Sequence, residues 1–289
     1  MASEKLQILK QPALKSPRLL VGLSGWMDSG EVSTGSIRFL VDALGAETFA
    51  QINSDGFYIE NFPGPMEMSA LFRPYTKIQN GLIKELWWPE NLFFFDEMYN
   101  LIFFLGREPN FGWKEFADCF FSLCSQFAVE QIYFVGSVAG LLPHTREPLF
   151  SCSVSDKKFR QKLQKLGLRF ANYQGPAGIV TYLTAKASDY NISMASLVAT
   201  VPAYVQGNNP ICIEAVIRRL LTLLGVHLDT NQLRSAGDEF ERKLTEAVQK
   251  EPELVEQIRK MEENYDNEIF DDQMDDLKHW LVKKGIRLD

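Results

Sequence analysis

The sequence predicts an α/β fold with a mostly parallel β-sheet and helices on both faces of the sheet. Short apolar runs rich in β-branched and aromatic residues alternate with longer stretches of helical apolar spacing, as in parallel sheets whose strands are connected by helices. Glycine and proline residues lie at the ends of many segments and mark the turns between them. The chain has 289 residues, of which 46% are hydrophobic, so it is long enough for one large core or for one core with an extension.

Three predicted strands end in polar turns, and the first functional hypothesis depends on them. They are residues 19–23, 101–105 and 132–135, and the last strand is expected to end at Gly136. In open α/β sheets, ligands bind beyond the carboxyl ends of the strands. If the three strands are parallel neighbours, their turns therefore meet in one pocket. The polar side chains expected in this pocket are Asp28, Arg107, Glu108, His144 and Arg146.

Residues 19–52 form a predicted βαβ unit. Residues 30–44 carry apolar side chains at helical spacing, and this helix is expected to end at Gly45. Residues 48–52 are then predicted to form a second strand. A unit of this kind implies parallel strands and a right-handed crossover.

Residues 53–91 interrupt the alternation and predict an antiparallel insertion that covers an edge of the sheet. The Asn80–Gly81 pair is a strong hairpin signal between predicted strands at 71–73 and 82–87. The region and the segment after it are rich in aromatic residues, which we expect to pack mainly in the core. An exposed patch for a partner subunit is the alternative. The aromatic residues concerned are Phe57, Tyr58, Trp87, Trp88 and Phe93–Phe95.

The rest of the body continues the alternation of helices and strands. Asn209 and Pro210 are expected to open the last helix of the body, because asparagine caps helices and proline favours the first helical turn. Gly175 and Pro176 are expected to begin an earlier helix, again with proline in the first turn. In chain order, the predicted elements are a helix at 112–129, a helix at 155–166, a strand at 168–171, a helix from Gly175 to Tyr190, a strand at 192–201 and a helix from Asn209 to Leu224.

A change in charge divides the chain near residue 228. Residues 229–289 contain 17 acidic and 10 basic residues, whereas residues 1–228 contain 20 of each. A neutral body with an acidic extension argues against a nucleic-acid partner, because phosphate binding needs a basic surface. We therefore predict an α/β domain at 1–228 and an extension at 229–289 whose amphipathic helices pack on the body or on another subunit. These helices are expected at 231–249, 252–263 and 271–283.

Several classes of protein find no support in the sequence. No run of about 18 or more apolar residues is present, so we expect no membrane-spanning helix. The N-terminal residues lack the apolar core of a signal peptide, and the four cysteines have no CxxC spacing, which together favour a cytoplasmic location. The three histidines are scattered along the chain, so we expect no metal site and no cofactor.

The sequence contains no complete catalytic motif. The serines near the predicted turns do not lie in the Gly-x-Ser-x-Gly pattern of a nucleophile elbow. The turn from Gly25 to Gly30 either binds an anion on its backbone N–H groups or is an ordinary strand-to-helix turn with Asp28 or Ser29 as the cap.

The basic residues of the turns also allow two interpretations. Arg146 either contacts a ligand or holds its own turn through a backbone carbonyl or Glu147. Arg107 and Glu108 form either a ligand clamp or an internal pair, because ion pairs serve structural roles as well.

Short motifs stand in a fixed order along the chain: Gly25–Gly30, Gly106–Pro109, Pro143–Arg146, Gly175–Pro176, Val201–Val205 and Asn209–Pro210. Taken together in this order, they resemble the proteasome assembly chaperone family, which comprises the type-2 chaperone and its bacterial and archaeal relatives. The resemblance covers roughly residues 15–228. It implies a three-layer α/β/α domain of the phosphorylase or hydrolase type that self-associates, often as a trimer, and has no enzymatic activity. Besides Asp28, Arg107, Glu108, His144 and Arg146, the motif positions are Gly25, Trp26, Gly30, Gly106, Pro109, Thr145, Gly175, Pro176, Pro202, Tyr204, Asn209 and Pro210.

Two positions depart from the family pattern. Ala203 stands where relatives often have histidine, which weakens a catalytic role at that position. Residues 286–289 lack the hydrophobic–tyrosine–any ending by which such chaperones dock into proteasome rings, which weakens the expectation of proteasome docking.

We therefore expect a non-enzymatic protein that self-associates as a homo-oligomer, with a further protein partner, and without nucleic-acid or membrane partners. The alternative is an enzyme of the nucleoside-phosphorylase type or a binder of small anions or nucleotides. In that case Arg107 and Arg146 would hold the anion and His144 would act as an acid or base. A third alternative is that the 229–289 extension alone mediates assembly.

Overall fold

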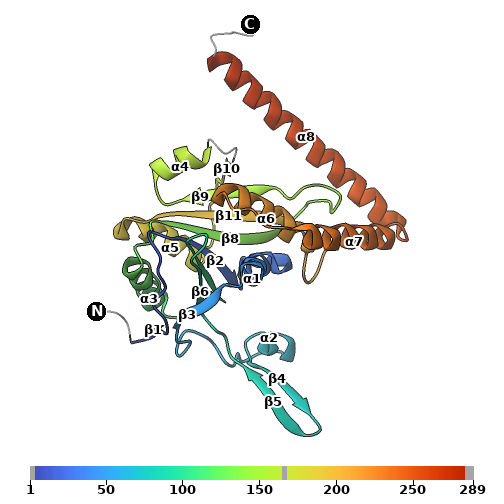
Figure 1. Cartoon of the computed structure of the whole chain (residues 1–289). Coiled ribbons are helices and arrows are strands. Elements are labelled where there is room, and N and C mark those ends of the chain that lie inside the picture. The colour runs from blue at the N-terminus through green and yellow to red at the C-terminus, as the bar shows by residue number, and fades with distance from the viewer. Residues whose placement is uncertain (1–3, 165–167, 284–289) are drawn as a thin grey trace.

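A nine-stranded sheet forms the centre of the protein (Figure 1). The computed structural model describes residues 4–164 and 168–283, with side chains up to residue 270. In chain order, the strands of this sheet are β1 (Leu6–Ile8), β2 (Arg18–Ser24), β3 (Glu47–Ile52), β6 (Leu92–Asp96), β7 (Leu101–Arg107), β8 (Gln131–Gly140), β9 (Phe150–Val154), β10 (Arg169–Phe170) and β11 (Ser193–Pro202).

The strand order is β1–β3–β6–β7–β2–β8–β11–β9–β10. Strands β7, β2, β8 and β11 are parallel neighbours and form the middle of the sheet. Strand β6 joins β7 in antiparallel fashion on one side, and β9 joins β11 in antiparallel fashion on the other. The three strands whose turns carry the predicted pocket residues, β7, β2 and β8, are therefore adjacent and parallel, as expected.

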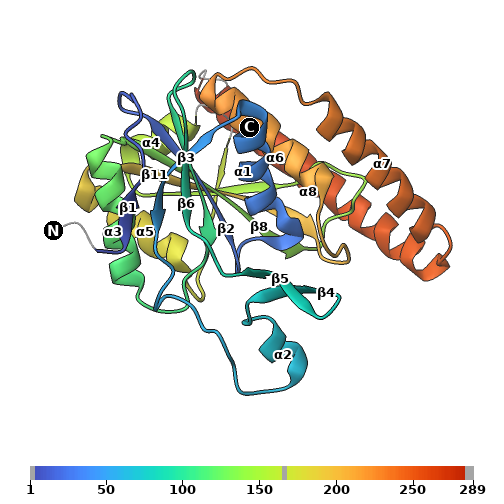
Figure 2. The ribbon, with the colours of Figure 1, turned by 60° about the horizontal axis from the view of Figure 1, so that its bottom comes forward.

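Helices cover both faces of the sheet (Figures 1 and 2). Alternate side chains of β2 point to opposite faces, so that Leu19 and Val21 join one apolar core and Leu20 joins the other. The helices of the first core are α3 (Trp113–Gln126) and α5 (Ile179–Ala187), and those of the second core are α1 (Val32–Leu44), α4 (Lys157–Gln164) and α6 (Pro210–Leu224). The predicted α/β class with a large, mostly parallel sheet is confirmed.

Several boundaries follow the local signals. Helix α1 ends at Gly45, which has the left-handed φ of 63° that glycine adopts without strain. Asn209 caps α6, because its Oδ1 accepts the Cys212 N–H at 3.1 Å. Both features were predicted.

Other boundaries differ from the prediction. Strand β8 does not end at Gly136: it continues to Gly140, paired with β11. A Cβ at Gly136 would lie 2.6 Å from the Phe134 ring, so this glycine makes room for an aromatic side chain and does not end the strand. Helix α5 begins at Ile179, after Gly175 and Pro176, which lie in the preceding loop. The predicted βαβ unit is present, because β2 and β3 run parallel in one sheet and α1 connects them, although β7 and β6 lie between the two strands.

The insertion forms a separate arm that projects from the body (Figure 1). It consists of α2 (Met66–Ala70), β4 (Tyr75–Gln79) and β5 (Leu82–Trp87), and residues 66–88 are called the insertion arm below. The Asn80–Gly81 hairpin is confirmed, but its first strand is at 75–79 and not at 71–73. Strands β4 and β5 form a two-stranded sheet of their own and do not pair with an edge strand of the central sheet.

The aromatic residues of this region divide between the core and the surface. Phe57 and Phe93 are fully buried, as expected. Trp87 and Trp88 are 44% and 49% exposed, which contradicts the core assignment for these two residues. The apolar character of the insertion arm is therefore not explained by the core.

The C-terminal region consists of α7 (Asn231–Val248) and α8 (Pro252–Lys283). Helix α7 packs along α6, and α8 extends beyond the body (Figures 1 and 2). Two helices were predicted at 252–263 and 271–283, but one helix spans both, since residues 264–270 contain no glycine or proline. Within the described part of the chain, none of the helices has the length and apolarity needed to span a bilayer.

Candidate functional site

The five predicted pocket residues lie near one edge of the sheet but have separate surroundings. The edge is formed by the carboxyl ends of β7, β2 and β8. Asp28 and Arg107 face a common cleft, whereas Glu108, His144 and Arg146 are not part of the lining of that cleft. The single five-residue pocket is therefore not what the structure forms.

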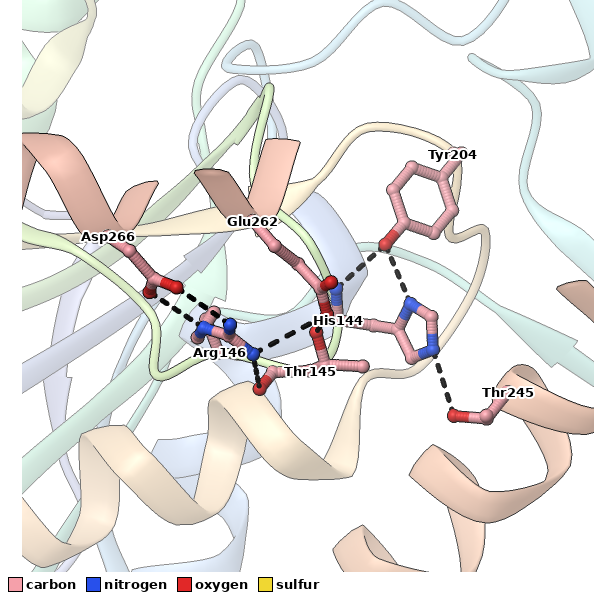
Figure 3. Close-up of polar contacts among 7 residues, drawn as sticks. All are labelled: His144, Thr145, Arg146, Tyr204, Thr245, Glu262 and Asp266. Carbon is pink, nitrogen blue, oxygen red and sulfur yellow. Dashed lines mark hydrogen bonds and ion pairs between the residues drawn. The ribbon is translucent and has the colours of Figure 1, made fainter. Parts of the chain in front are cut away.

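His144 is buried and fully hydrogen-bonded (Figure 3). The Tyr204 hydroxyl accepts the His144 backbone N–H at 2.7 Å and lies 2.8 Å from His144 Nδ1. His144 Nε2 lies 3.1 Å from Thr245 Oγ1, so both ring nitrogens have a hydroxyl group as hydrogen-bond partner. Burial lowers the pKa of His144, against a smaller raising effect of Glu262. His144 is thus a neutral group that connects the β8 turn to Tyr204 and α7.

Thr145 and Arg146 bind helix α8 (Figure 3). The Thr145 hydroxyl donates to a carboxylate oxygen of Glu262. Arg146 makes a two-pronged contact with Asp266, with N–O distances of 2.9 and 2.8 Å, and its Nη1 lies 3.4 Å from Glu262. The hydrogen bonds between them raise the pKa of Arg146 and lower that of Asp266.

The neighbouring residue completes this arrangement. Arg146 Nη1 also donates to the Thr145 carbonyl at 3.3 Å, whereas Glu147 accepts from Arg218 on α6 at 2.9 and 3.0 Å. Four successive polar side chains, from His144 to Glu147, therefore bind α6, α7, α8 and Tyr204. The turn is a docking platform for the C-terminal helices.

Glu108 joins two motifs that are far apart in the sequence. One carboxylate oxygen accepts the Trp26 N–H and the other accepts the Ile179 N–H at the start of α5, both at 3.0 Å. A Cβ at Gly25 or Gly178 would lie 3.0 or 2.8 Å from the Glu108 side chain. The glycines are needed for this close approach, and Gly25 has a φ of 131° besides. Glu108 therefore bonds to backbone N–H groups and does not pair with Arg107.

Asp28 holds the first turn of α1. Its two carboxylate oxygens accept the Thr34 N–H at 3.0 Å and the Thr34 hydroxyl at 2.8 Å. Burial raises the pKa of Asp28 and outweighs these hydrogen bonds, which lower it. The turn is therefore a strand-to-helix connection held by Asp28, but the N-cap of α1 is Glu31 and not Asp28 or Ser29.

Arg107 and Asp28 face a cleft of about 550 Å³ between the sheet edge and the insertion arm. Arg107 Nη2 donates to the Leu71 carbonyl at 3.0 Å and so ties β7 to the arm. The sequence did not predict this cleft, because one of its walls belongs to the insertion, whose residues were expected in the core or over an edge of the sheet. The residues it missed include Arg38, Arg73, Tyr75, Trp87 and Trp88.

The sequence model of the PAC2 family matches residues 22–248. The chain belongs to the PAC2 family. The resemblance to the proteasome assembly chaperone family is thereby confirmed. No curated protein matches this PAC2 chain.

Solved structures share the PAC2 fold. A Mycobacterium tuberculosis protein of unknown function is 20% identical, with a TM-score of 0.80, and the match covers 91% of each chain. A proteasome-assembly chaperone homologue from the same organism is 23% identical, with a TM-score of 0.71, over 83% of this chain and 99% of that one. An archaeal proteasome activator from Pyrococcus furiosus is 16% identical, with a TM-score of 0.61, over 86% and 99%.

The remaining PAC2 motif positions mainly fix loops against each other. The Asn209 N–H donates to the Gly30 carbonyl at 2.8 Å, and a Cβ at Gly30 would lie 3.0 Å from the Asn209 Cβ. Gly106 has no room for a Cβ because Asn91 Oδ1 would be 2.7 Å away. The Pro109 carbonyl accepts the Trp113 indole N–H at 2.9 Å.

Three further motif positions also lie at the ends of elements or hold a loop, and a fourth position does not. Pro202 ends β11, Pro210 is the first residue of α6, and the Pro176 carbonyl accepts the Tyr173 hydroxyl at 3.1 Å. Trp26 is the exception, since its side chain is exposed. Of the two departures from the family pattern, Ala203 bonds through its N–H to the Gly140 carbonyl at 3.0 Å, and residues 286–289 lie outside the described residues.

Nucleophilic catalysis finds no support in this arrangement. Ser137 donates to the Ser29 carbonyl at 2.7 Å, and the His144 ring nitrogens bond to Tyr204 and Thr245. Within residues 4–164 and 168–270, no group of three or more histidine, cysteine, aspartate or glutamate side chains could hold a metal ion.

Proposed function

We propose that this PAC2 protein is a non-enzymatic, self-associating protein that binds other proteins in a chaperone-like manner. The main support is the insertion arm, which exposes apolar side chains that are not part of the core of the body. Two relatives of similar fold are described as a proteasome-assembly chaperone homologue and a proteasome activator, and these descriptions agree with a protein-binding role.

The hairpin of the insertion arm has one apolar face and one mixed face. Cross-strand pairing places Ile78 opposite Ile83 and Thr76 opposite Leu86 on the apolar face. The other face carries the Tyr75–Trp87 ring contact and the Lys77–Glu85 ion pair. All residues of β4 and β5 are exposed, and Ile83 reaches 71%. A two-stranded hairpin is marginally stable alone in water, so an apolar face of this kind favours burial against another chain.

We assign this face to a second copy of the same chain, with a trimer as the expected stoichiometry. The apolar face is uncharged, so the faces of three chains can meet around a three-fold axis although each chain carries a net charge of −7. Strands β4 and β5 also present free edges that can pair with strands of another subunit.

Finer structural and cellular assignments accompany this proposal. We propose that the domain is of the three-layer, phosphorylase-like type and that the acidic extension begins near residue 229. We also propose a cytoplasmic location, which agrees with the burial of all four cysteines.

Light scattering coupled to gel filtration tests self-association. The wild-type chain should elute with a mass that is a multiple of 33.0 kDa, whereas Ile83→Lys should elute at 33.0 kDa because a charge on the apolar face prevents its burial. Leu141→Lys is the matched control, since Leu141 is 86% exposed and lies in the turn after β8, away from the arm. A wild-type monomer, or an oligomer that Ile83→Lys leaves intact, would contradict the proposal.

A further inference from the structure

The cleft beside the insertion arm lies at a topological switch point of the sheet. Strands β2 and β7 are parallel neighbours, but β2 leads into α1 on one face and β7 leads into α3 on the other. Connections that diverge in this way leave a crevice at the carboxyl ends of the two strands, where α/β proteins bind ligands. The cleft lies there, and its volume of about 550 Å³ is in the range of small-molecule sites.

Three arginines line this cleft, and none of them forms an ion pair with the described residues. They come from different elements: Arg38 from α1, Arg73 from the insertion arm and Arg107 from β7. Elsewhere in the described chain, several arginines are matched by carboxylates, as Arg146 is by Asp266 and Arg218 is by Glu147. The positive charges of the three cleft arginines are therefore not neutralised by a direct contact with a carboxylate of the described residues.

Two of these guanidinium groups are held in place by neutral acceptors. Arg107 donates from Nη2 to the Leu71 carbonyl at 3.0 Å. Arg73 donates from Nη2 to Asn61 Oδ1 at 2.8 Å and from Nε to Ser69 Oγ at 3.3 Å. A guanidinium has five N–H donors, so each group keeps donors for a ligand. Positioned guanidinium groups with spare donors suit carboxylate or phosphate oxygens.

The aromatic wall of the cleft consists of Tyr75, Trp87 and Trp88. Tyr75 and Trp87 line the cleft with their ring centroids 5.1 Å apart, and Trp88 follows directly in the sequence. The two tryptophans are about half exposed and have no place in the core. Indole and phenol faces of this kind stack on flat rings.

Carboxylates in the lining of the cleft limit how much negative charge a ligand can carry. Asp28, Glu31 and Glu90 also line the cleft, so its lining is not uniformly positive. Asp28 is already bonded to Thr34. A polyanion would be repelled by these groups, whereas a ligand with a single anionic end is compatible with them.

We propose that this cleft binds a small molecule in which a planar ring carries one anionic group, either phosphate or carboxylate. The guanidinium groups of Arg38, Arg73 and Arg107 hold the anion, and the aromatic wall holds the ring. The lining of this site belongs to one chain, and the Tyr75–Trp87 contact lies on the mixed face of the hairpin and not on the apolar face assigned to self-association.

Isothermal titration calorimetry of the full chain with four probes tests the proposal. AMP and 4-hydroxybenzoate carry a ring and an anion, adenosine carries the ring alone, and inorganic phosphate carries the anion alone. We expect AMP or 4-hydroxybenzoate to bind at least about tenfold more tightly than adenosine and inorganic phosphate. Tighter binding of AMP favours phosphate on a purine ring, and tighter binding of 4-hydroxybenzoate favours carboxylate on a phenol ring. If neither binds more tightly than the two partial probes, the proposal fails.

Single arginine variants locate the binding. Arg73→Gln and Arg107→Gln should each weaken the tighter probe by about tenfold or more. Arg38→Gln should weaken it as well, and it leaves the link between β7 and the arm untouched because Arg38 is exposed on α1. Arg234→Gln on α7 removes the same charge outside the cleft and should keep wild-type affinity. Wild-type affinity in all three cleft variants would overturn the assignment.

Discussion

The turn after β8 and the insertion arm differ in how completely their side chains find partners. The turn contains His144, Thr145, Arg146 and Glu147, a run of residues that suggests a catalytic or ligand-binding site. Each of these side chains is bonded within the chain. The arm contains tryptophans and isoleucines that suggest a core, yet they are exposed. The comparison teaches that side chains without partners inside the chain mark the surface that is free to bind. Polar side chains as such do not mark it.

The largest effect is expected where a single side chain satisfies two backbone groups. Glu108→Ala should lower the free energy of unfolding by about 2–4 kcal/mol, because the Trp26 and Ile179 N–H groups both lose their acceptor. Glu108→Gln keeps one carbonyl oxygen and should lose about half as much. Urea denaturation measures both values.

The control for this comparison is Glu60→Gln, which changes the same charge at an exposed position. It should leave the free energy of unfolding within about 0.5 kcal/mol of the wild type. A wild-type value for Glu108→Ala would show that the motif carboxylate is not structural and would reopen a ligand role for it.

A smaller effect is expected from the pH dependence of the β8 turn. Burial lowers the pKa of His144 in the folded chain, so in the pH range between this value and about 6.5 the unfolded chain binds a proton that the folded chain does not. Stability should therefore fall as the pH falls below about 6.5, by at most about 1.4 kcal/mol per pH unit from this group.

Urea denaturation at several pH values between 5 and 8 isolates this contribution when the wild type is compared with His144→Gln. The glutamine variant lacks the titrating group, so its stability should depend less steeply on pH in this range. Parallel pH profiles of the two proteins would mean that His144 is not held neutral by the fold. In that case the side chains of the turn would be less completely hydrogen-bonded than the structure indicates.

The sequence predicted the middle of the fold because its signals are local. The apolar runs at β2 and β7 and the helical spacing of α1 and α3 depend only on residues near each other, and the structure contains all four elements. Strand β6 was missed because its aromatic residues were attributed to the insertion. The end of β8 was misplaced because Gly136 makes room for the Phe134 ring instead of ending the strand.

The candidate site was less predictable because its partners are distant in the sequence. The adjacency of β7, β2 and β8 followed from the α/β pattern, so the common edge could be predicted. Three partners of the β8 turn, Thr245, Glu262 and Asp266, lie more than a hundred residues further along the chain. No local pattern shows that these residues return to the turn. The arginine cleft was missed for a similar reason, because the insertion arm forms one of its walls.

The smallest effect is expected at the apolar face of the insertion arm. Ile83→Lys should change the free energy of unfolding by less than about 1 kcal/mol, because Ile83 contacts solvent on one side and loses only its cross-strand pairing with Ile78. Urea denaturation at a concentration where the chain is monomeric measures this value, with Leu141→Lys as the exposed control. The same variant is expected to abolish self-association. A large change in assembly with a small change in stability would show that the arm serves contacts outside the chain. A loss of more than about 2 kcal/mol would instead mean that the arm packs on its own body, and the contrast between the two regions would disappear.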